Sequence, residues 1–216
     1  MYKLFFKRFF DIIISLIALP FFLLLFIPIA IMIKIGDRGP VFYKAERIGK
    51  NGRMIKMLKF RSMKVNAPNI LNADGSTYNA KDDPRVTKIG KILRETSLDE
   101  IPQILNVLKG DMSIIGPRAS NYSALESYLE DEMDKLKVRP GITGYVQAYY
   151  RNNATPHEKR VHDGWYANNL TLWLDIKIIF KTIAVVLKRE NLYTSTEAAN
   201  AEQPKKETEK ETEKQL

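Results

Sequence analysis

The chain has 216 residues, enough for one domain of modest size with a hydrophobic core. It contains no cysteine, which excludes disulfides, thiolate metal sites and a cysteine nucleophile. The formal net charge is +9, and such an excess of lysine and arginine favours anionic lipid head groups, phosphorylated substrates or nucleic acid as partners. Composition does not choose among these three.

The first predicted element is an apolar run, residues 12–33, which holds 22 residues and no charged side chain. As one helix it would rise about 33 Å, enough to cross the roughly 30 Å hydrocarbon layer of a membrane. A cleaved secretory signal is not expected, because the run is long, Asp11 directly precedes it and no small-residue cleavage site follows. We therefore expect the run to be part of the mature chain.

Basic residues flank the run on both sides, with Lys3, Lys7 and Arg8 before it and a denser set after it. The second set comprises Lys34, Arg38, Lys44, Arg47, Lys50, Arg53, Lys56, Lys59, Arg61 and Lys64. Because basic flanks stay in the cytoplasm, a straight span would export the first set, whereas a re-entrant segment would keep both inside. Pro20 and Pro28 each favour a bend, but a kinked single span tolerates them too. The residues therefore leave both topologies open.

The region after the run contains signals for a hairpin and two short helices. Residues 41–65 mix short apolar pieces with basic residues, and an Asn-Gly pair between them is typical of a tight turn in a β-hairpin. Residues 66–84 are rich in Asn, Asp, Pro and Gly and predict a loop, followed by a short helix over 85–94. In residues 101–109 the apolar positions recur at spacings of three and four, which predicts a helix that ends at Gly110.

Two adjacent carboxylates, Asp99 and Glu100, precede this last helix, and two registers fit them. With Ser97 as N-cap, Ser97 and Glu100 form an S-x-x-E capping box and Asp99 lies in the first helical turn. That register places Pro102 at the fifth helical position, where its missing N–H loses a hydrogen bond. With Ile101 as the cap, Pro102 takes the first helical position and both carboxylates precede the helix as free groups.

Either register makes the pair suitable for phosphate chemistry. A helix N-terminus stabilises anions, so both carboxylates are expected to be ionised at neutral pH. Mg²⁺ takes one or two carboxylates plus substrate oxygens, and a carboxylate can also attack phosphorus to form an acyl phosphate. The loops at 116–118 and 139–141 read Gly-Pro-Arg and Arg-Pro-Gly. They pair open backbone with guanidinium groups, which bind phosphate in a two-pronged geometry.

The rest of the chain is predicted to be mainly helical. Residues 119–137 and 157–168 are expected to form helices, with a backbone-permissive loop over 139–144. Residues 170–189 predict a long amphipathic helix whose regular charges argue against a second membrane span. Its broad apolar face suits either the core of the domain or a membrane surface. From residue 194 the composition has no apolar period and is typical of a disordered tail.

Several blocks of the sequence, taken in order and spacing, resemble one protein family. They are KRFFD at 7–11 with the apolar run after it, GPVFY at 39–43, LKFRSM at 58–63, LRETSLDEIPQILNVLKGDMSIIGPR at 93–118 and RPGITG at 139–144. Together they extend the resemblance over about residues 2–190. The chain is similar to the bacterial sugar transferases, the monotopic polyprenol-phosphate phosphoglycosyl transferases.

This resemblance implies an enzyme that moves a sugar-1-phosphate from a UDP-sugar to undecaprenyl phosphate and releases UMP. The lipid-linked diphosphosugar would start a glycan such as an exopolysaccharide, a capsule, an O-antigen or a glycoprotein sugar. By the same resemblance, Asp99 is the nucleophile that becomes phosphoglycosylated, and Glu100 helps to hold a Mg²⁺ cofactor. The candidates for binding substrate phosphates are Lys59, Arg94, Arg118 and Arg139.

The resemblance also implies a fold and a location. We expect a small, mostly helical α/β membrane-associated domain with amphipathic surface helices. Residues 1–36 would form a re-entrant membrane helix, 37–190 the catalytic domain and 191–216 a disordered polar tail. The catalytic domain is expected on the cytoplasmic face of the bacterial inner membrane. Its expected partners are the UDP-sugar, undecaprenyl phosphate and membrane lipids, without nucleic acid, and no oligomeric state is predicted.

The sequence departs from the family pattern in three places. Leu23 and Leu24 stand where a Ser-Pro pair is common in the middle of the membrane segment, so the bend falls to one of the two flanking prolines. Ala119 follows Gly-Pro-Arg, where proline is usual. Residues 145–150 read YVQAYY instead of the usual WAQVNG, which leaves the donor sugar open.

Two other functions are compatible with the same residues. A membrane-bound phosphohydrolase would use an Asp99 acyl phosphate with water as the acceptor, and it would not need lipid. A non-catalytic membrane adaptor would use only the basic surface, and Asp99 and Glu100 would then be a helix cap. Dependence of turnover on undecaprenyl phosphate separates the first from a transferase. The effect of Asp99→Asn separates the second.

Overall fold

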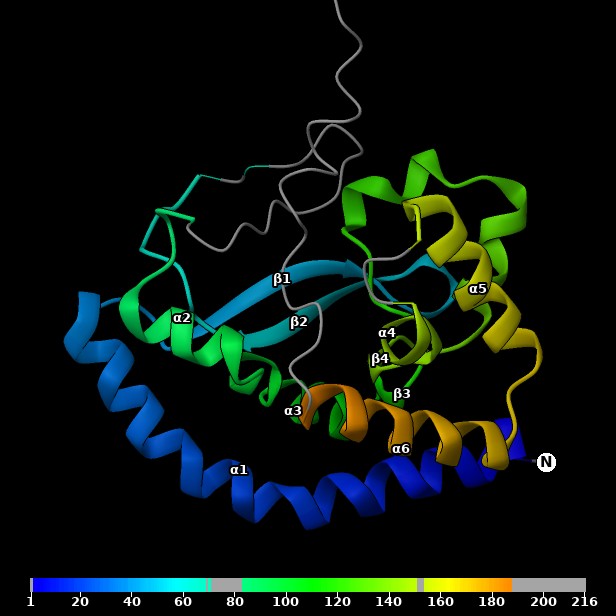
Figure 1. The fold of residues 1–216 in the computed structure, drawn as a ribbon, viewed down its shortest axis with the longest axis horizontal. Coiled ribbons are helices and arrows are strands. Elements are labelled where there is room, and N and C mark those ends of the chain that lie inside the picture. Colours follow the sequence, from blue (N-terminus) through cyan, green and yellow to red (C-terminus); the bar gives the residue numbers. More distant parts are fainter. Residues whose placement is uncertain (1, 69, 71–82, 151–153, 188–216) are drawn as a thin grey trace, which may run out of the picture.

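The computed structural model describes residues 2–68, 70, 83–150 and 154–187 (Figure 1). The helices are α1 (Lys7–Asp37), α2 (Lys88–Glu95), α3 (Gln103–Lys109), α4 (Tyr145–Tyr149), α5 (Pro156–Asn168) and α6 (Leu172–Leu187). The strands are β1 (Phe42–Ile48), β2 (Met54–Phe60), β3 (Ser113–Ile115) and β4 (Gly141–Thr143). A π-helical stretch, Tyr2–Phe6, precedes α1, and 3-10 segments occur at Lys50–Gly52, Leu98–Glu100, Tyr122–Ser127 and Glu130–Lys137. The mostly helical α/β fold is confirmed, whereas the predicted tail and most of the predicted loop 66–84 lie outside the described residues.

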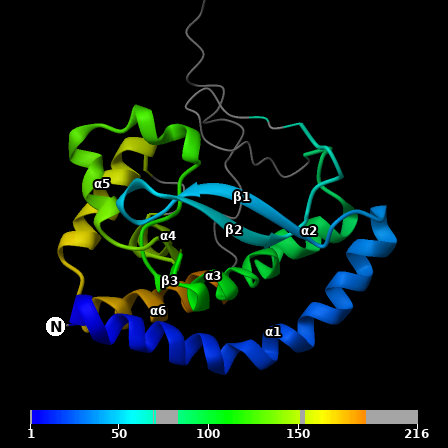
Figure 2. The ribbon, with the colours of Figure 1, turned by 180° about the vertical axis from the view of Figure 1, so that it is seen from behind.

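The predicted hairpin is confirmed, with β1 and β2 antiparallel and Phe42 opposite Phe60. Asn51 and Gly52 at its turn both have positive φ, which is why this position favours Asn-Gly. The inner face of the hairpin packs on α3 and the segment after it, in a core cluster of Ala45, Ile55, Met57, Val107 and Met112. Figures 1 and 2 show the hairpin on one side of α2 and α3, and α1 on the other.

The other short elements follow the predictions in part. The helix expected over 85–94 is α2, which begins at Lys88 because the Thr87 hydroxyl caps it by accepting from the Gly90 N–H at 2.9 Å. The helices expected over 157–168 and 170–189 are α5 and α6. The single helix expected over 119–137 is wrong, because two 3-10 segments with a break at Tyr128 and Leu129 replace it.

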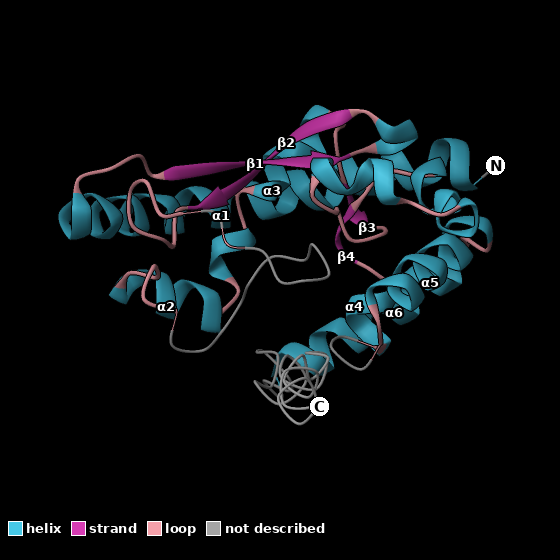
Figure 3. Ribbon diagram, turned by 90° about the horizontal axis from the view of Figure 1, so that it is seen from above, coloured by secondary structure: helices cyan, strands magenta, loops and turns pink. Residues whose placement is uncertain are grey.

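A second correction concerns residues 139–144, predicted as a loop. Gly141–Thr143 is strand β4, which pairs in parallel with β3, so that Ser113 lies opposite Gly141. A Cβ added at Gly116 would lie 2.4 Å from the Arg139 carbonyl oxygen, so glycine is required where the segments next to β3 and β4 approach each other. Strands of three residues are too short to show a period in the sequence, which is why β3 and β4 were not predicted. Figure 3 shows this pair apart from the hairpin, with α4, α5 and α6 grouped beyond it.

Helix α1 is one continuous helix of 31 residues that runs through both prolines. Its buried residues lie on one stripe at spacings of four and seven, and they are Asp11, Ser15, Phe22, Ile29 and Ile33. The remaining faces expose apolar side chains along most of the length. Among the described residues it is the one helix whose length and composition would allow it to cross a membrane. Figure 1 shows α1 bent, with its middle farthest from the rest of the domain and both ends turned toward it.

The start of α1 is bound to the domain by polar contacts. The Asp11 carboxylate accepts from the Ser113 hydroxyl and the Ile114 N–H, each at 2.9 Å. The Arg8 guanidinium donates to the carbonyl oxygens of Val107 and Leu108 at the end of α3. Because these contacts join α1 to α3 and β3, the apolar helix and the segment that carries the two carboxylates form one structural unit.

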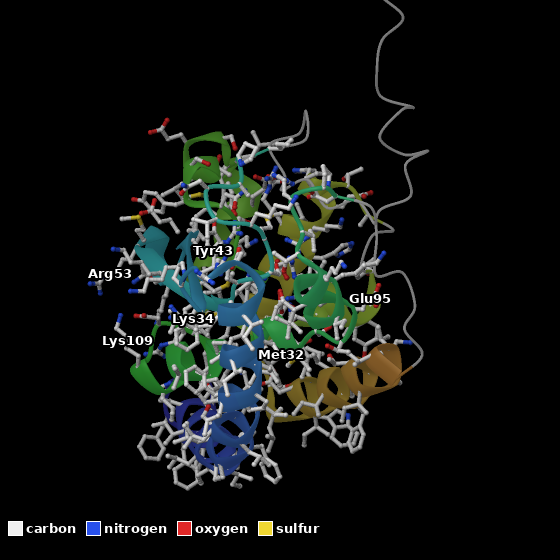
Figure 4. The ribbon with its side chains drawn as sticks, turned by 90° about the vertical axis from the view of Figure 1, so that its left-hand side faces the viewer. Met32, Lys34, Tyr43, Arg53, Glu95 and Lys109 are labelled. Carbon is white, nitrogen blue, oxygen red and sulfur yellow. The ribbon has the colours of Figure 1, made fainter. Side chains whose placement is uncertain are left out.

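Helix α6 has a buried face and an exposed apolar face. Ile178 and Val185 are buried in the domain, so one face of the helix packs in the core, which is one of the two alternatives that the sequence left open. Trp173 and Phe180 are 65% and 69% exposed, so a second apolar face has no cover from the described residues. In Figure 4 side chains of α6 and of α1 project from the same side of the molecule. Helix α6 therefore packs one apolar face in the core of the domain and leaves a second apolar face exposed.

Candidate active site

The two adjacent carboxylates lie in a 3-10 turn directly before α3. Ser97 has a φ of +57° and its side chain caps nothing, so the capping-box register is wrong. Pro102 is the N-cap of α3, and the helix begins at Gln103. Asp99 and Glu100 therefore precede the helix, as in the second register, although the cap is one residue later than predicted. The proline favours this arrangement, because its missing N–H costs no hydrogen bond at a helix start.

The surroundings of the two carboxylates drive their pKa values apart. Burial, together with the Glu100 charge, raises the pKa of Asp99 to about 6, although Lys59 and Arg94 act against this rise. Burial also disfavours the charged form of Glu100, but Lys59 and Arg118 outweigh it and lower its pKa to about 2. Lys59 Nζ lies 2.6 Å from Glu100 Oε1. Glu100 is thus a permanent anion, whereas Asp99 is a more basic carboxylate that is largely ionised at pH 7.

Three predicted phosphate-binding residues, Lys59, Arg94 and Arg118, lie near this pair, and each comes from a different element. Lys59 comes from β2, which the Asn106 side chain holds against α3 by accepting from the Leu58 N–H at 2.8 Å. Arg94 comes from α2, and its Nε donates to the Ser62 hydroxyl at 2.9 Å.

Arg118 follows β3, in a loop that two buried residues support. The Arg118 N–H donates to Asp163 Oδ2 at 3.1 Å, and Lys135 Nζ donates to the Arg118 carbonyl oxygen at the same distance. Lys135 and Asp163 are themselves ion-paired at 3.3 Å. The backbone of this loop is therefore held by buried charges, while the Arg118 side chain stays exposed.

The structure does not bring Arg139 to the carboxylates. Ser113 N–H donates to the Pro140 carbonyl oxygen at 2.9 Å, and this pairing directs Arg139 toward the end of α3. There Arg139 Nε donates to the Gly110 carbonyl oxygen at 2.7 Å. The two carboxylates lie before the opposite end of the same helix. Arg139 thus stabilises a helix C-terminus, which carries partial negative charge.

Arg47 of β1 is a cation near the site that the sequence interpretation missed. Its guanidinium is close enough to Arg118 and Glu100 for their charges to affect its pKa. In the sequence it was counted only among the basic residues after the apolar run. A signal in the sequence could have found it. Arg47 lies two residues after Ala45, and alternate residues of a strand share one face, which here is the buried inner face of the hairpin.

The donor set fits Mg²⁺ only in combination with a substrate. Across residues 2–68, 70, 83–150 and 154–187 no group of three or more His, Asp or Glu side chains could enclose a metal ion. Mg²⁺ commonly keeps several waters and binds through one or two carboxylates plus substrate phosphates. Asp99 and Glu100 supply such carboxylates, and Lys59 occupies one oxygen of Glu100. A cation shared with a phosphate therefore fits these residues, whereas a cage made by the protein alone does not.

Comparison with known proteins identifies a family for this chain. The family model described as Bacterial sugar transferase matches residues 2–189. The chain belongs to the bacterial sugar transferase family. This family member is 40% identical over 204 residues to the undecaprenyl-phosphate galactose phosphotransferase of Salmonella typhimurium, covering 88% of the chain and 42% of that protein. It is 42% identical over 186 residues to the UDP-glucose:undecaprenyl-phosphate glucose-1-phosphate transferase of Klebsiella pneumoniae, covering 82% and 39%.

A third relative of this family member is similar in length. The exopolysaccharide production protein ExoY of Rhizobium meliloti is 40% identical over 195 residues, which cover 85% of the chain and 86% of that protein. The chain spans less than half the length of the first two relatives. The family model spans both the apolar helix and the carboxylate pair, in keeping with the contacts that join them.

The raised pKa of Asp99 predicts a cost in stability for this family member. Its carboxyl binds a proton more tightly in the folded chain than in the unfolded chain, so stability is lost as pH rises from about 4 through about 6. In metal-free protein, Asp99→Asn should therefore raise the free energy of unfolding at pH 7.5, by about 3 kcal/mol at most. Thermal unfolding in detergent with a chelator measures this, and the difference should shrink toward pH 4. A variant less stable than the wild type at pH 7.5 would contradict it.

Proposed function

We propose that this chain transfers a sugar-1-phosphate from a UDP-sugar to undecaprenyl phosphate and releases UMP. One observation carries the proposal: two adjacent carboxylates with opposite pKa shifts lie beside Lys59, Arg94 and Arg118. Such a pair supplies a basic nucleophile and a permanent anion next to cations that suit phosphates. The names of the Salmonella and Klebsiella relatives support the two substrates, and the name of the Rhizobium relative supports a product used for exopolysaccharide.

The first half of the reaction forms a covalent intermediate. An oxygen of the Asp99 carboxylate attacks the phosphorus that carries the sugar, and a new O–P bond forms. The bond between this phosphorus and the oxygen that bridges to the second phosphate breaks, and UMP leaves with that oxygen. The burial that raises the pKa of Asp99 keeps its carboxylate poorly solvated and hence more nucleophilic.

The second half transfers the group to lipid. A phosphate oxygen of undecaprenyl phosphate attacks the same phosphorus, the bond to Asp99 breaks, and the carboxylate regains its electron pair. The product is the lipid-linked diphosphosugar. Because UMP leaves before the lipid reacts, the two substrates should show ping-pong kinetics.

The other residues of the site stabilise charged groups of the protein and of the substrates. Lys59 pairs with Glu100 and, with Arg118, keeps it anionic. Glu100 is the residue that would hold Mg²⁺, which when bound neutralises phosphate charge. Arg94 lies near enough to Asp99 to favour its ionised form, and Arg118 presents an exposed guanidinium to a phosphate.

We place residues 1–36, which hold nearly all of α1, in the inner membrane as a re-entrant segment, with the catalytic domain 37–190 on the cytoplasmic face. The bend of α1, with both ends turned toward the domain, supports this topology (Figure 1). So does the distribution of side chains, because one stripe faces protein and the other faces expose apolar surface that water would not favour. The exposed apolar face of α6, with Trp173 and Phe180, would lie in the membrane surface.

Cysteine labelling tests this topology, because the chain contains no cysteine of its own. Lys3→Cys introduces a thiol at an exposed position before α1, and Lys44→Cys introduces one on the hairpin. A membrane-impermeant maleimide should label neither variant in intact cells and both after permeabilisation. Labelling of the Lys3→Cys protein alone in intact cells would contradict the re-entrant helix and favour a straight span.

Release of UMP tests the activity. Detergent-solubilised protein is given Mg²⁺ and a panel of UDP-sugars, with and without undecaprenyl phosphate. Sustained UMP release with one sugar only when the lipid is present would confirm the transferase and name the donor. Sustained release without lipid would identify a phosphohydrolase instead. No UMP from any of the sugars would contradict both.

A further inference from the structure

The end of strand β1 brings Arg47 to the loop that carries Arg118. Arg47 forms an isolated antiparallel bridge with Asn121, and the Ile48 N–H donates to the Ser120 carbonyl oxygen at 3.0 Å. The hairpin therefore docks, through its backbone, on Ser120 and Asn121, two and three residues after Arg118. Arg47 is half-buried on the inner face of β1, the face that packs on the domain.

The Arg47 side chain has no partner in the part of the chain that the structure describes. Its Nε is buried and makes no hydrogen bond, and the guanidinium forms no ion pair with a carboxylate. The Arg118 contacts are made by its backbone, and its guanidinium likewise has no carboxylate partner among these residues. A buried donor without a partner is costly, so such groups usually have a reason to be kept.

The two guanidiniums also repel each other. Burial and the neighbouring Arg118 charge lower the pKa of Arg47, while Tyr43 and Glu100 act in the opposite direction. Lys59 Nζ lies 2.6 Å from Glu100 Oε1, so the negative charge of Glu100 is already paired with Lys59. Two cations held together beside one anion leave an unbalanced positive charge, which an incoming anion would neutralise.

We propose that Arg47 and Arg118 together bind one phosphate group of a substrate at the carboxylate pair. The inference rests on the proposed function and adds a residue to it. A guanidinium offers two parallel N–H groups that match two phosphate oxygens, and two such groups can hold a dianion that a single lysine could not orient. The phosphate belongs either to the diphosphate of the UDP-sugar or to undecaprenyl phosphate, which share this chemistry.

Three variants test the pair, namely Arg47→Gln, Arg47→Lys and the control Arg53→Gln. Arg53 lies on the same hairpin, is exposed and points away from the domain (Figure 4). Titration calorimetry with Mg²⁺ present measures binding of UMP and of a short-chain polyprenyl phosphate, and kinetics give the KM of each substrate. Arg47→Gln should weaken one of the two ligands and raise the matching KM at least tenfold, Arg47→Lys should have a smaller effect, and Arg53→Gln should have none.

The ligand that is weakened identifies the phosphate, UMP indicating the donor and the polyprenyl phosphate the acceptor. Unchanged affinity for both ligands and unchanged KM values in Arg47→Gln would overturn the proposal. Thermal unfolding excludes a merely structural role, because removal of an unpaired buried cation should leave the unfolding temperature of the metal-free protein at or above that of the wild type. A clear fall relative to Arg53→Gln would overturn the proposal as well. If the wild type released no UMP from any UDP-sugar, the proposed function would fail, but the binding measurements would still decide about Arg47.

Discussion

Replacement of Asp99 by asparagine should abolish turnover, with kcat reduced by about a thousandfold or more. An amide of the same size cannot attack phosphorus, so no covalent intermediate can form. UMP release measures the loss. Intact-protein mass spectrometry, after incubation with the UDP-sugar but without lipid, should detect a phosphoglycosyl adduct on the wild type and none on the variant.

The asparagine variant is a sharp test because it should remain folded. The raised pKa of Asp99 shows that the folded chain disfavours its charge, so the neutral side chain should stabilise the protein while it inactivates it. Asp111→Asn is the matched control, because Asp111 pairs with the exposed Lys109 at the far end of α3, at 2.8 Å. Wild-type turnover in Asp99→Asn would place the nucleophile at another residue.

Replacement of Glu100 by glutamine should reduce kcat by about a hundredfold and raise the Mg²⁺ concentration needed for half-maximal rate. The amide keeps the shape but loses the permanent charge that Lys59 and Arg118 maintain. The loss of this charge should also lower the pKa of Asp99, since Glu100 contributes to raising it, and so make the nucleophile less basic. Initial rates over a Mg²⁺ titration measure both effects.

Two outcomes distinguish a metal-binding role of Glu100 from a structural one. Glu95→Gln, on the last turn of α2, serves as the control and should leave the Mg²⁺ dependence unchanged. If Glu100→Gln lowered the rate with the same Mg²⁺ dependence as the wild type, Glu100 would act only by holding Lys59. In that case the assignment of Glu100 as the metal-binding residue would be wrong.

Local signals in the sequence were sufficient for several elements. The Asn-Gly turn predicted the hairpin because these residues adopt positive φ at low cost, and both do so here. Apolar spacings of three and four predicted α3, an apolar run broken by regular charges predicted α6, and Gly110, with a φ of +98°, ends α3 as expected. These predictions hold because they depend on residues close in the chain. The prediction of one helix over 119–137 was wrong because acidic and apolar residues there fit 3-10 segments as well as an α-helix.

The carboxylate pair shows where local reasoning stops. Two registers fitted Asp99 and Glu100, and the structure is close to the second, with both carboxylates before the helix and Pro102 as its N-cap. The sequence predicted both groups to be ionised at neutral pH, but the opposite directions of their pKa shifts depend on burial and on Lys59 and Arg118. Those two cations are 41 residues before Glu100 and 18 after it, as the numbering shows. Only the hairpin packed on α3 and the loop after β3 bring them to it.

What the sequence by itself determined is therefore the family, through blocks in fixed order, together with the apolar helix, the hairpin and the candidate residues for the chemistry. What only the tertiary structure decided is which cations surround the carboxylates. Arg139 stands in a loop motif that suits phosphate, yet the pairing of β4 with β3 directs it to the Gly110 carbonyl oxygen. Arg47 has no motif that marks it, yet its strand docks beside Arg118. Charge interactions act through space over a few ångströms, and the packing of distant segments, not their spacing along the chain, sets those distances.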